Sequence, residues 1–131
     1  MRFLMFSLAA LTLAGCADHP VDQVEGLIES VDEQLCRCPT LAGEDFCTMP
    51  ARLTSAEKSC RRRVYDEYEG ELADNFDCRI DALEQLDRCL GAAACDLAAV
   101  EYCLGAAQAR VSVCPETTEA ASEALDACDL D

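Results

Sequence analysis

The sequence predicts an all-α protein, a small disulfide-stapled bundle of four to five helices. Apolar residues recur at steps of three and four along most of the chain, and no segment alternates with the period of two that is typical of a strand. The 131 residues include eleven cysteines. Tryptophan is absent and alanine is frequent, so each helix buries little apolar area and crosslinks are expected to supply stability.

The first fifteen residues have the features of a targeting segment rather than of a folded element. Arg2 supplies a positive charge, and an apolar run extends from Phe3 to Leu13. A helix needs about 20 residues to span a bilayer, so this run has instead the length of the apolar region of a signal peptide. It ends in Leu13-Ala14-Gly15-Cys16, an aliphatic residue and two small residues before a cysteine.

This ending resembles the lipobox of bacterial lipoproteins. The resemblance implies cleavage before Cys16, lipid on its thiol, a short tether over 16–19 and a folded domain over 20–131. The implied partner is the membrane, through the lipid on Cys16, and the implied location is the cell envelope. Ala17 rather than aspartate follows the cysteine, which favours the outer membrane in a Gram-negative host.

The first helix is expected from Pro20 to Arg37. Proline suits the first helical position, and Asp22 and Glu25 lie in the positively polarised first turn. One apolar stripe runs along this helix: Val21, Val24, Leu27, Ile28, Val31 and Leu35. A loop from Pro39 to Leu53 follows, and its length calls for a tether.

The second helix begins at a capping-box pattern, Thr54-Ser55-Ala56-Glu57. Gly70 and Asp74-Asn75 suggest a break or sharp kink, although a continuous helix is also possible. The basic cluster Arg61-Arg62-Arg63 is expected to form surface ion pairs with acidic residues four positions on, or to dock an acidic partner.

Three further segments complete the predicted bundle. A helix is expected over 76–91, a short turn over 91–95, and a helix over 97–113 that Asp96 caps. Pro115 is expected to open a last helix that reaches Cys128.

Ten cysteines remain after Cys16, and an even number in an exported chain predicts five disulfides. Cys78 and Cys89 are separated by ten residues, and so are Cys103 and Cys114. Each pair therefore lies on one helix face about 16 Å apart, too far for a bond within the pair. An antiparallel hairpin over 76–114, centred on residue 96, predicts the nested bonds Cys78–Cys114 and Cys89–Cys103. This twin CX10C layout resembles the twin CX9C helical hairpins, with one extra residue in each spacer.

The other six cysteines are less determined by their spacing. We expect Cys36–Cys60 to staple a first hairpin, Cys38–Cys47 to close the loop, and Cys95–Cys128 to hold the C-terminus. The exchange of Cys36–Cys47 with Cys38–Cys60 stays open. Together with the lipobox and Cys36-Arg37-Cys38-Pro39, these regular cysteines resemble small cysteine-rich helical lipoproteins of Gram-negative bacteria.

The composition excludes several classes of function and partner. The formal net charge of −16 repels phosphates, so no nucleic-acid partner is expected. His19 is the single histidine, and neither a Gly-x-Ser-x-Gly elbow nor a glycine-rich phosphate loop occurs. We therefore expect no catalytic residues, no metal and no cofactor. The favoured function is a non-catalytic envelope lipoprotein with a binding or structural role, for which the expected partner is a protein of the cell envelope. The alternative is a redox or metal-handling protein that uses its cysteines.

Overall fold

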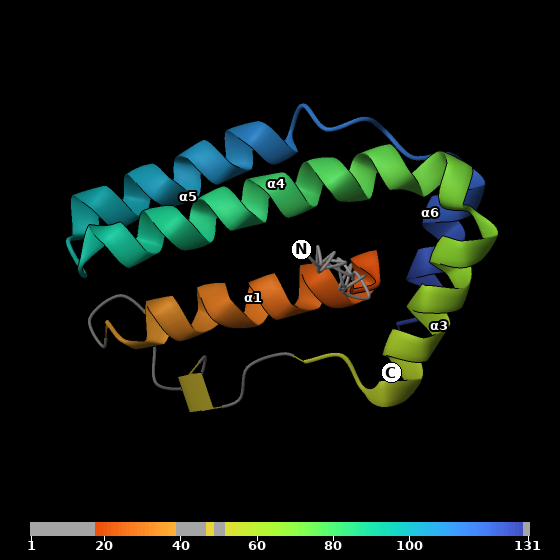
Figure 1. The fold of residues 1–131 in the computed structure, drawn as a ribbon, viewed down its shortest axis with the longest axis horizontal. Helices are drawn as coiled ribbons and strands as arrows, with labels where there is room; N and C mark the ends of the chain where they lie inside the picture. The colour runs from red at the N-terminus through yellow and green to blue at the C-terminus, as the bar shows by residue number, and fades with distance from the viewer. Residues whose placement is uncertain (1–17, 39–46, 49–51, 130–131) are drawn as a thin grey trace, which may run out of the picture.

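The computed structural model describes residues 18–38, 47–48 and 52–129. The helices in this part are α1 (Pro20–Cys36), α3 (Ser55–Glu67), α4 (Glu69–Ala93), α5 (Leu97–Val111) and α6 (Glu119–Asp126). No strand occurs among these described residues. The predicted all-α, disulfide-stapled architecture is therefore confirmed, with five helices (Figure 1).

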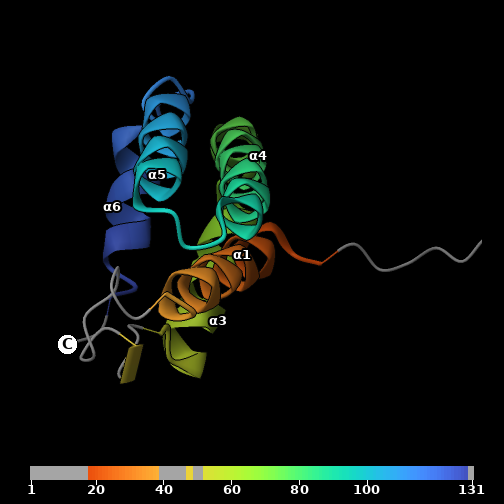
Figure 2. The ribbon, with the colours of Figure 1, turned by 90° about the vertical axis from the view of Figure 1, so that its left-hand side faces the viewer.

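The long helix α4 is the centre of the bundle. It packs against α1 and against α5, which forms an antiparallel hairpin with it (Figures 1 and 2). In Figure 1, α1 runs in the same direction as α4, whereas α3 and α6 lie side by side across the end where α4 begins. The molecule therefore consists of a three-helix arm and a two-helix end.

Two separate apolar clusters hold these parts together. In the arm, α1, α4 and α5 bury Val31, Leu86, Leu90, Ala93, Val100 and Cys103. At the two-helix end, α1, α3, α4 and α6 bury Val21, Tyr65, Leu72 and Ala121. Because α1 and α4 contribute to both clusters, these two helices fix the end relative to the arm.

The helix starts follow the sequence signals in three of four cases, and α1 begins at Pro20 as predicted. The Thr54 side chain accepts from the Glu57 amide at 3.2 Å, and the Glu57 carboxylate accepts from the Thr54 amide at 2.5 Å. Asp96 accepts from the Ala99 amide at 2.8 Å. The last helix begins later than predicted, at Glu119 rather than Pro115, because Thr118 supplies its N-cap.

The break after the second helix also differs from the prediction. It falls at Tyr68, whose φ of −111° and ψ of 26° end α3 and turn the chain into α4. Residues 74 and 75 lie inside α4, which continues to Ala93, and the turn to α5 occupies 94–96. Packing overrides the weak helix preference of Asp74 and Asn75, since Asn75 is buried and its side chain donates to the Pro115 carbonyl at 2.6 Å.

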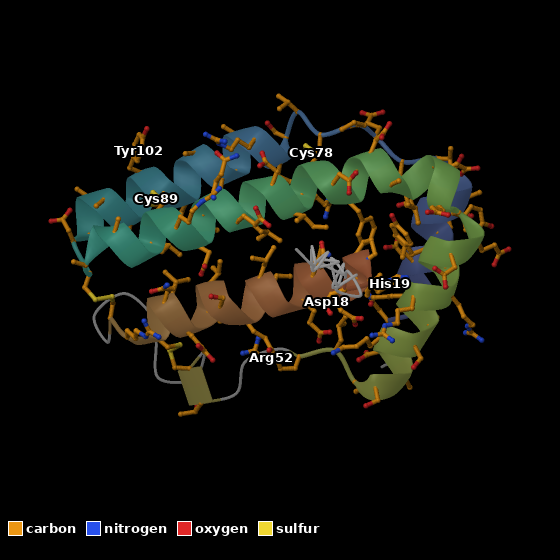
Figure 3. All side chains as sticks on the ribbon, in the orientation of Figure 1. Asp18, His19, Arg52, Cys78, Cys89 and Tyr102 are labelled. Atoms are coloured by element: carbon orange, nitrogen blue, oxygen red, sulfur yellow. A yellow bond between two sulfur atoms is a disulfide. The ribbon has the colours of Figure 1, made fainter. Side chains whose placement is uncertain are left out.

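The α4–α5 hairpin contains the two bonds that the twin spacing predicts. Cys78 is joined to Cys114 and Cys89 to Cys103, with both Cα–Cα distances 5.7 Å. Figure 3 shows Cys78 and Cys89 at separate points along α4. The hairpin thus has one crosslink near its turn and one near its open end.

The predicted pairing of the other six cysteines is wrong. The structure joins Cys36 to Cys47, as in the exchange that stayed open, but Cys38 to Cys95 and Cys60 to Cys128. The expected bonds Cys36–Cys60, Cys38–Cys47 and Cys95–Cys128, and the alternative Cys38–Cys60, do not form.

The path of α3 is the physical reason. Lys58 and Arg62 of α3 pair with Glu25 and Asp22, so Cys60 lies beside the N-terminal part of α1. Cys36 is eleven residues beyond Glu25, about 16 Å farther along the helix axis. Likewise α6 packs on α3, which places Cys128 next to Cys60 and at the opposite end of α4 from Cys95.

Candidate functional site

A cleft of about 590 Å³ lies between α1, α3, α4 and α6. Its apolar lining includes Val24 and Ile28 from α1, Leu53 from the segment before α3, Phe76 from α4 and Leu125 from α6. Ile28 remains 41% exposed. The cleft therefore presents apolar surface to solvent where four helices converge.

The aromatic packing behind the cleft fixes Phe76. Tyr65 is buried and contacts Phe76 edge to face, with ring centroids 5.0 Å apart. On its other side Tyr65 meets the His19 ring at 5.1 Å. Burial, and then the nearby carboxylates of Asp77, Glu69 and Asp66, raise the pKa of the Tyr65 hydroxyl. This aromatic packing supports Phe76 in one wall of the cleft.

His19 caps α1 and does not face the cleft lining. Its Nδ1 accepts a hydrogen bond from the Val21 amide at 3.2 Å, and Nε2 lies 3.1 Å from Asp66 Oδ1. Acceptance at Nδ1 requires the ring to be unprotonated there, so Nε2 is the donor to Asp66. The single histidine therefore joins the start of α1 to α3 (Figure 3).

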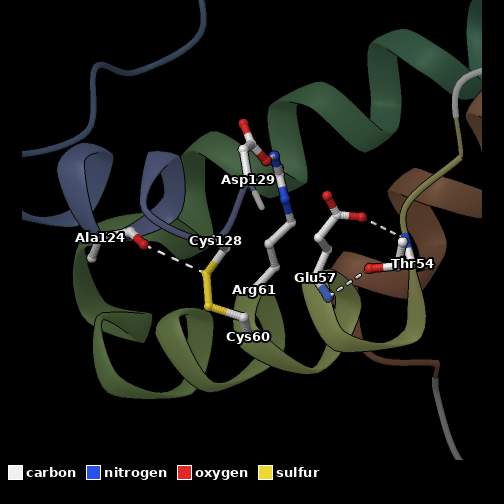
Figure 4. The surroundings of a disulfide bond; sticks show 7 residues. All are labelled: Thr54, Glu57, Cys60, Arg61, Ala124, Cys128 and Asp129. Atoms are coloured by element: carbon white, nitrogen blue, oxygen red, sulfur yellow. Dashed lines mark hydrogen bonds and ion pairs between the residues drawn. A yellow bond between two sulfur atoms is a disulfide. The ribbon is translucent and has the colours of Figure 1, made fainter. Parts of the chain in front are cut away.

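Three arginines line the cleft. Arg52 lies 3.5 Å from both Glu29 and Asp32 of α1 (Figure 3). Arg61 pairs through Nη2 with Asp129, beside the Cys60–Cys128 bond (Figure 4). Arg79 makes no ion pair or side-chain hydrogen bond within the part of the chain that the structure describes.

One further donor in the cleft is unused. Arg61 Nε is buried and has no hydrogen-bond partner among the described residues, although Nη2 of the same guanidinium is occupied. A buried donor without a partner costs about 1–3 kcal/mol. The exposed Arg79 guanidinium therefore offers hydrogen bonds to a group that enters the cleft, whereas Arg61 Nε is shielded from solvent.

The acidic residues of the lining are mostly engaged. Glu25 pairs with Lys58 Nζ at 2.7 Å, and this hydrogen bond is the main cause that raises the Lys58 pKa. Glu57 completes the α3 capping box. Asp126 is the remaining carboxylate, and its side chain has no partner within the described ranges. The cleft is therefore far less acidic than the chain as a whole.

The basic cluster does not act as predicted. Arg61 and Arg62 pair with Asp129 and Asp22, across helices, rather than with residues four positions along α3. Asp66, expected to be one of those partners, is bonded to His19 instead. The cluster points toward α1 and the C-terminal segment because α3 packs between them.

The predicted site residues are distributed as follows. The lipobox and Cys16 lie outside the described residues, and the ten other cysteines are all in disulfides. Within the described ranges, no group of three or more His, Cys, Asp or Glu side chains is placed to hold a metal ion. No helix of that part is long and apolar enough to cross a membrane.

Sequence reasoning did not identify the cleft. Val24 and Ile28 belong to the same stripe as the core residues of α1, and periodicity does not separate a cleft wall from a packed face.

No protein-family model, curated protein or solved structure matches the chain.

Proposed function

We propose that this protein is an exported, lipid-anchored and non-catalytic binding protein whose cleft holds a small ligand. The observation that carries the proposal is the cleft itself, which combines an apolar lining with the unpaired guanidinium of Arg79. Its volume falls in the range of small-molecule sites, roughly 300–1,000 Å³. The disulfide frame supports it, because crosslinked helices keep such a cleft open without a ligand.

The lipid anchor rests on the lipobox and on the cysteine chemistry. Five disulfides are typical of an oxidising compartment outside the cytoplasm. Helix α1 begins four residues after Cys16, so an anchor there would hold the domain close to the membrane surface. The proposed location is the cell envelope, at the outer membrane in a Gram-negative host.

Replacement of Cys16 tests the anchor. The variant Cys16→Ala is expected to leave the membrane fraction, while the parent protein stays there and gains the mass of its lipid. The matched control is Cys36→Ala, which removes a cysteine but leaves the lipobox intact. A Cys16→Ala protein that stays membrane-bound, beside a parent that keeps its precursor mass, would contradict lipidation.

A tryptophan reporter tests the binding role, because the chain contains no tryptophan. Phe76→Trp places the reporter in the cleft wall, and Tyr102→Trp places it on α5, where Tyr102 is 73% exposed (Figure 3). The full-length protein is studied on phosphatidylcholine vesicles with octanoate, octanol and octylammonium. At least one of the three is expected to change the Phe76→Trp emission saturably, and to leave Tyr102→Trp unchanged.

The result that overturns the binding role is equally direct. If none of the three compounds separates the two reporters, the cleft does not bind small amphiphiles. Circular dichroism checks that Phe76→Trp is folded, and Ile28→Trp serves as a second reporter in the same cleft.

Thiol titration separates this proposal from the redox or metal-handling alternative. With the disulfides formed and Cys16 lipidated, the purified protein is expected to show no free thiol, before or after denaturation, and no stoichiometric zinc. Several reactive thiols or one equivalent of bound metal would favour the alternative.

A further inference from the structure

We infer that the cleft selects single-chain amphiphiles with an anionic head, of the class of fatty-acid carboxylates; this inference rests on the binding role proposed above. The apolar chain would lie against Val24, Ile28, Phe76 and Leu125. The carboxylate would accept hydrogen bonds from the exposed guanidinium of Arg79. The juxtaposition of this apolar lining with an unpaired arginine identifies the ligand class.

Charge distribution is the first argument for an anionic head. The chain carries 26 acidic residues against 10 lysines and arginines, so carboxylates are abundant everywhere. Yet neither Arg79 nor Arg61 Nε is used by one of them within the described residues. A carboxylate from outside can pair with the exposed Arg79 guanidinium through a charge-assisted hydrogen bond.

The disposition of the acidic residues is the second argument. A cationic head would need free carboxylates in the lining, but Glu25 is bound to Lys58 and Glu57 to its capping box. Of the carboxylates that line the cleft, Asp126 alone has no side-chain partner within the described residues. The unpaired Arg79 therefore favours an anionic head group, whereas the unpaired Asp126 disfavours one.

Cleft geometry limits the ligand to a small amphiphile. The apolar residues come from three helices and face a single volume of about 590 Å³, with Ile28 still partly open to solvent. A neutral alcohol of equal length gains the same apolar contact but leaves the Arg79 guanidinium without a charged partner. Selectivity by charge is therefore the property that distinguishes this inference from simple hydrophobic uptake.

The test compares the three head groups with the Phe76→Trp reporter on phosphatidylcholine vesicles, at about pH 7, where the carboxylate is ionised. Octanoate is expected to bind about tenfold or more tightly than octanol, because a hydrogen bond to a charged group contributes roughly 1.5–3 kcal/mol. Octylammonium is expected to bind most weakly. Equal affinity for octanoate and octanol would overturn the anionic selectivity and leave the binding role intact.

Matched arginine variants localise the head group. Arg79→Met is expected to weaken octanoate about tenfold and to leave octanol unchanged. Arg63→Met removes the same charge from an exposed position on α3 outside the cleft, and is expected to change neither affinity. If both variants weaken octanoate equally, only the net charge matters and the assigned site is wrong.

The acidic residue of the lining gives a test in the opposite direction. Asp126→Asn removes the one free carboxylate and is expected to tighten octanoate and to leave octanol as it was. Weaker octanoate binding by this variant would contradict the assigned polarity of the cleft. Since Asp126 lies at the exposed end of α6, the variant is expected to fold like the parent.

Discussion

Cys38, just beyond α1, is bonded to Cys95 in the turn between α4 and α5, with their Cα atoms 5.4 Å apart. This bond joins the C-terminal end of α1 to the C-terminal end of α4, so the two helices run parallel (Figure 1). It closes a span of 57 residues, whereas the neighbouring Cys36–Cys47 bond closes only 11. The difference in span leads to a first prediction.

The double variant Cys38→Ala with Cys95→Ala is expected to lose about 4 kcal/mol of unfolding free energy in the chain-entropy description. Cys36→Ala with Cys47→Ala is the matched control and is expected to lose about 3 kcal/mol. Denaturant unfolding under oxidising conditions measures both. A larger loss from the short loop would show that native contacts, not loop closure, dominate.

The turn itself contains strained backbone. Ala94 has φ 49° and ψ 42°, the left-handed conformation, which costs an L-residue roughly 1–2 kcal/mol. Ala94→Gly is therefore expected to stabilise the protein by about 0.5–1 kcal/mol. Ala109 is exposed within α5, and Ala109→Gly is expected to lower the stability by a similar amount. Thermal unfolding of the two variants compares these effects. Destabilisation by both variants would contradict the strain.

The buried hydroxyl of Tyr65 is expected to make the protein less stable in alkaline solution. Burial raises the pKa of its hydroxyl, so the unfolded chain releases the proton first as the pH rises. The stability is complete below the ordinary pKa of about 10 and is lost as the pH climbs through the folded value. Unfolding free energies of Tyr65→Phe and the parent, compared from about pH 9 to 11, are expected to show a shallower decline in the variant.

Lys58 acts in the same direction and stays in that variant. The hydrogen bond to Glu25 raises its pKa, so the folded state holds the ammonium proton longer than the unfolded chain does. Tyr65→Phe should therefore reduce the alkaline decline without abolishing it. An unchanged slope would mean that the Tyr65 hydroxyl is not shielded from water.

Asn75 connects α4 to the segment that precedes α6. Its Nδ2 donates to the Pro115 carbonyl at 2.6 Å from a buried position. Asn75→Ala is expected to cost about 1–2 kcal/mol, because the hydrogen bond that this buried side chain donates is lost. Gln85→Ala, which removes the 2.6 Å bond to Asp81 one helical turn away, should cost under about 0.5 kcal/mol by the same denaturant assay. Equal losses would rule out a special role for Asn75.

The sequence by itself determined the helices, the N-caps Thr54 and Asp96, and the α4–α5 hairpin. These features depend on neighbours within one or two turns, or on a short turn that forces two helices side by side. The nested bonds Cys78–Cys114 and Cys89–Cys103 follow from two equal spacings about one turn. The break at Tyr68 was misplaced because packing keeps Asp74 and Asn75 inside α4, and the start of α6 was misplaced because Thr118 caps it.

Only the tertiary structure decided how the two-helix end meets the arm. Periodicity assigns residues to a face of a helix, but it does not say which other helix that face meets after a long loop. The partners of Cys38, Cys60 and Cys95 depend on that path, and so does the cleft between α1, α3, α4 and α6. Ile28 shows the reason most directly: its place in the apolar stripe was readable, but its exposure follows from where α3 and α6 come to rest.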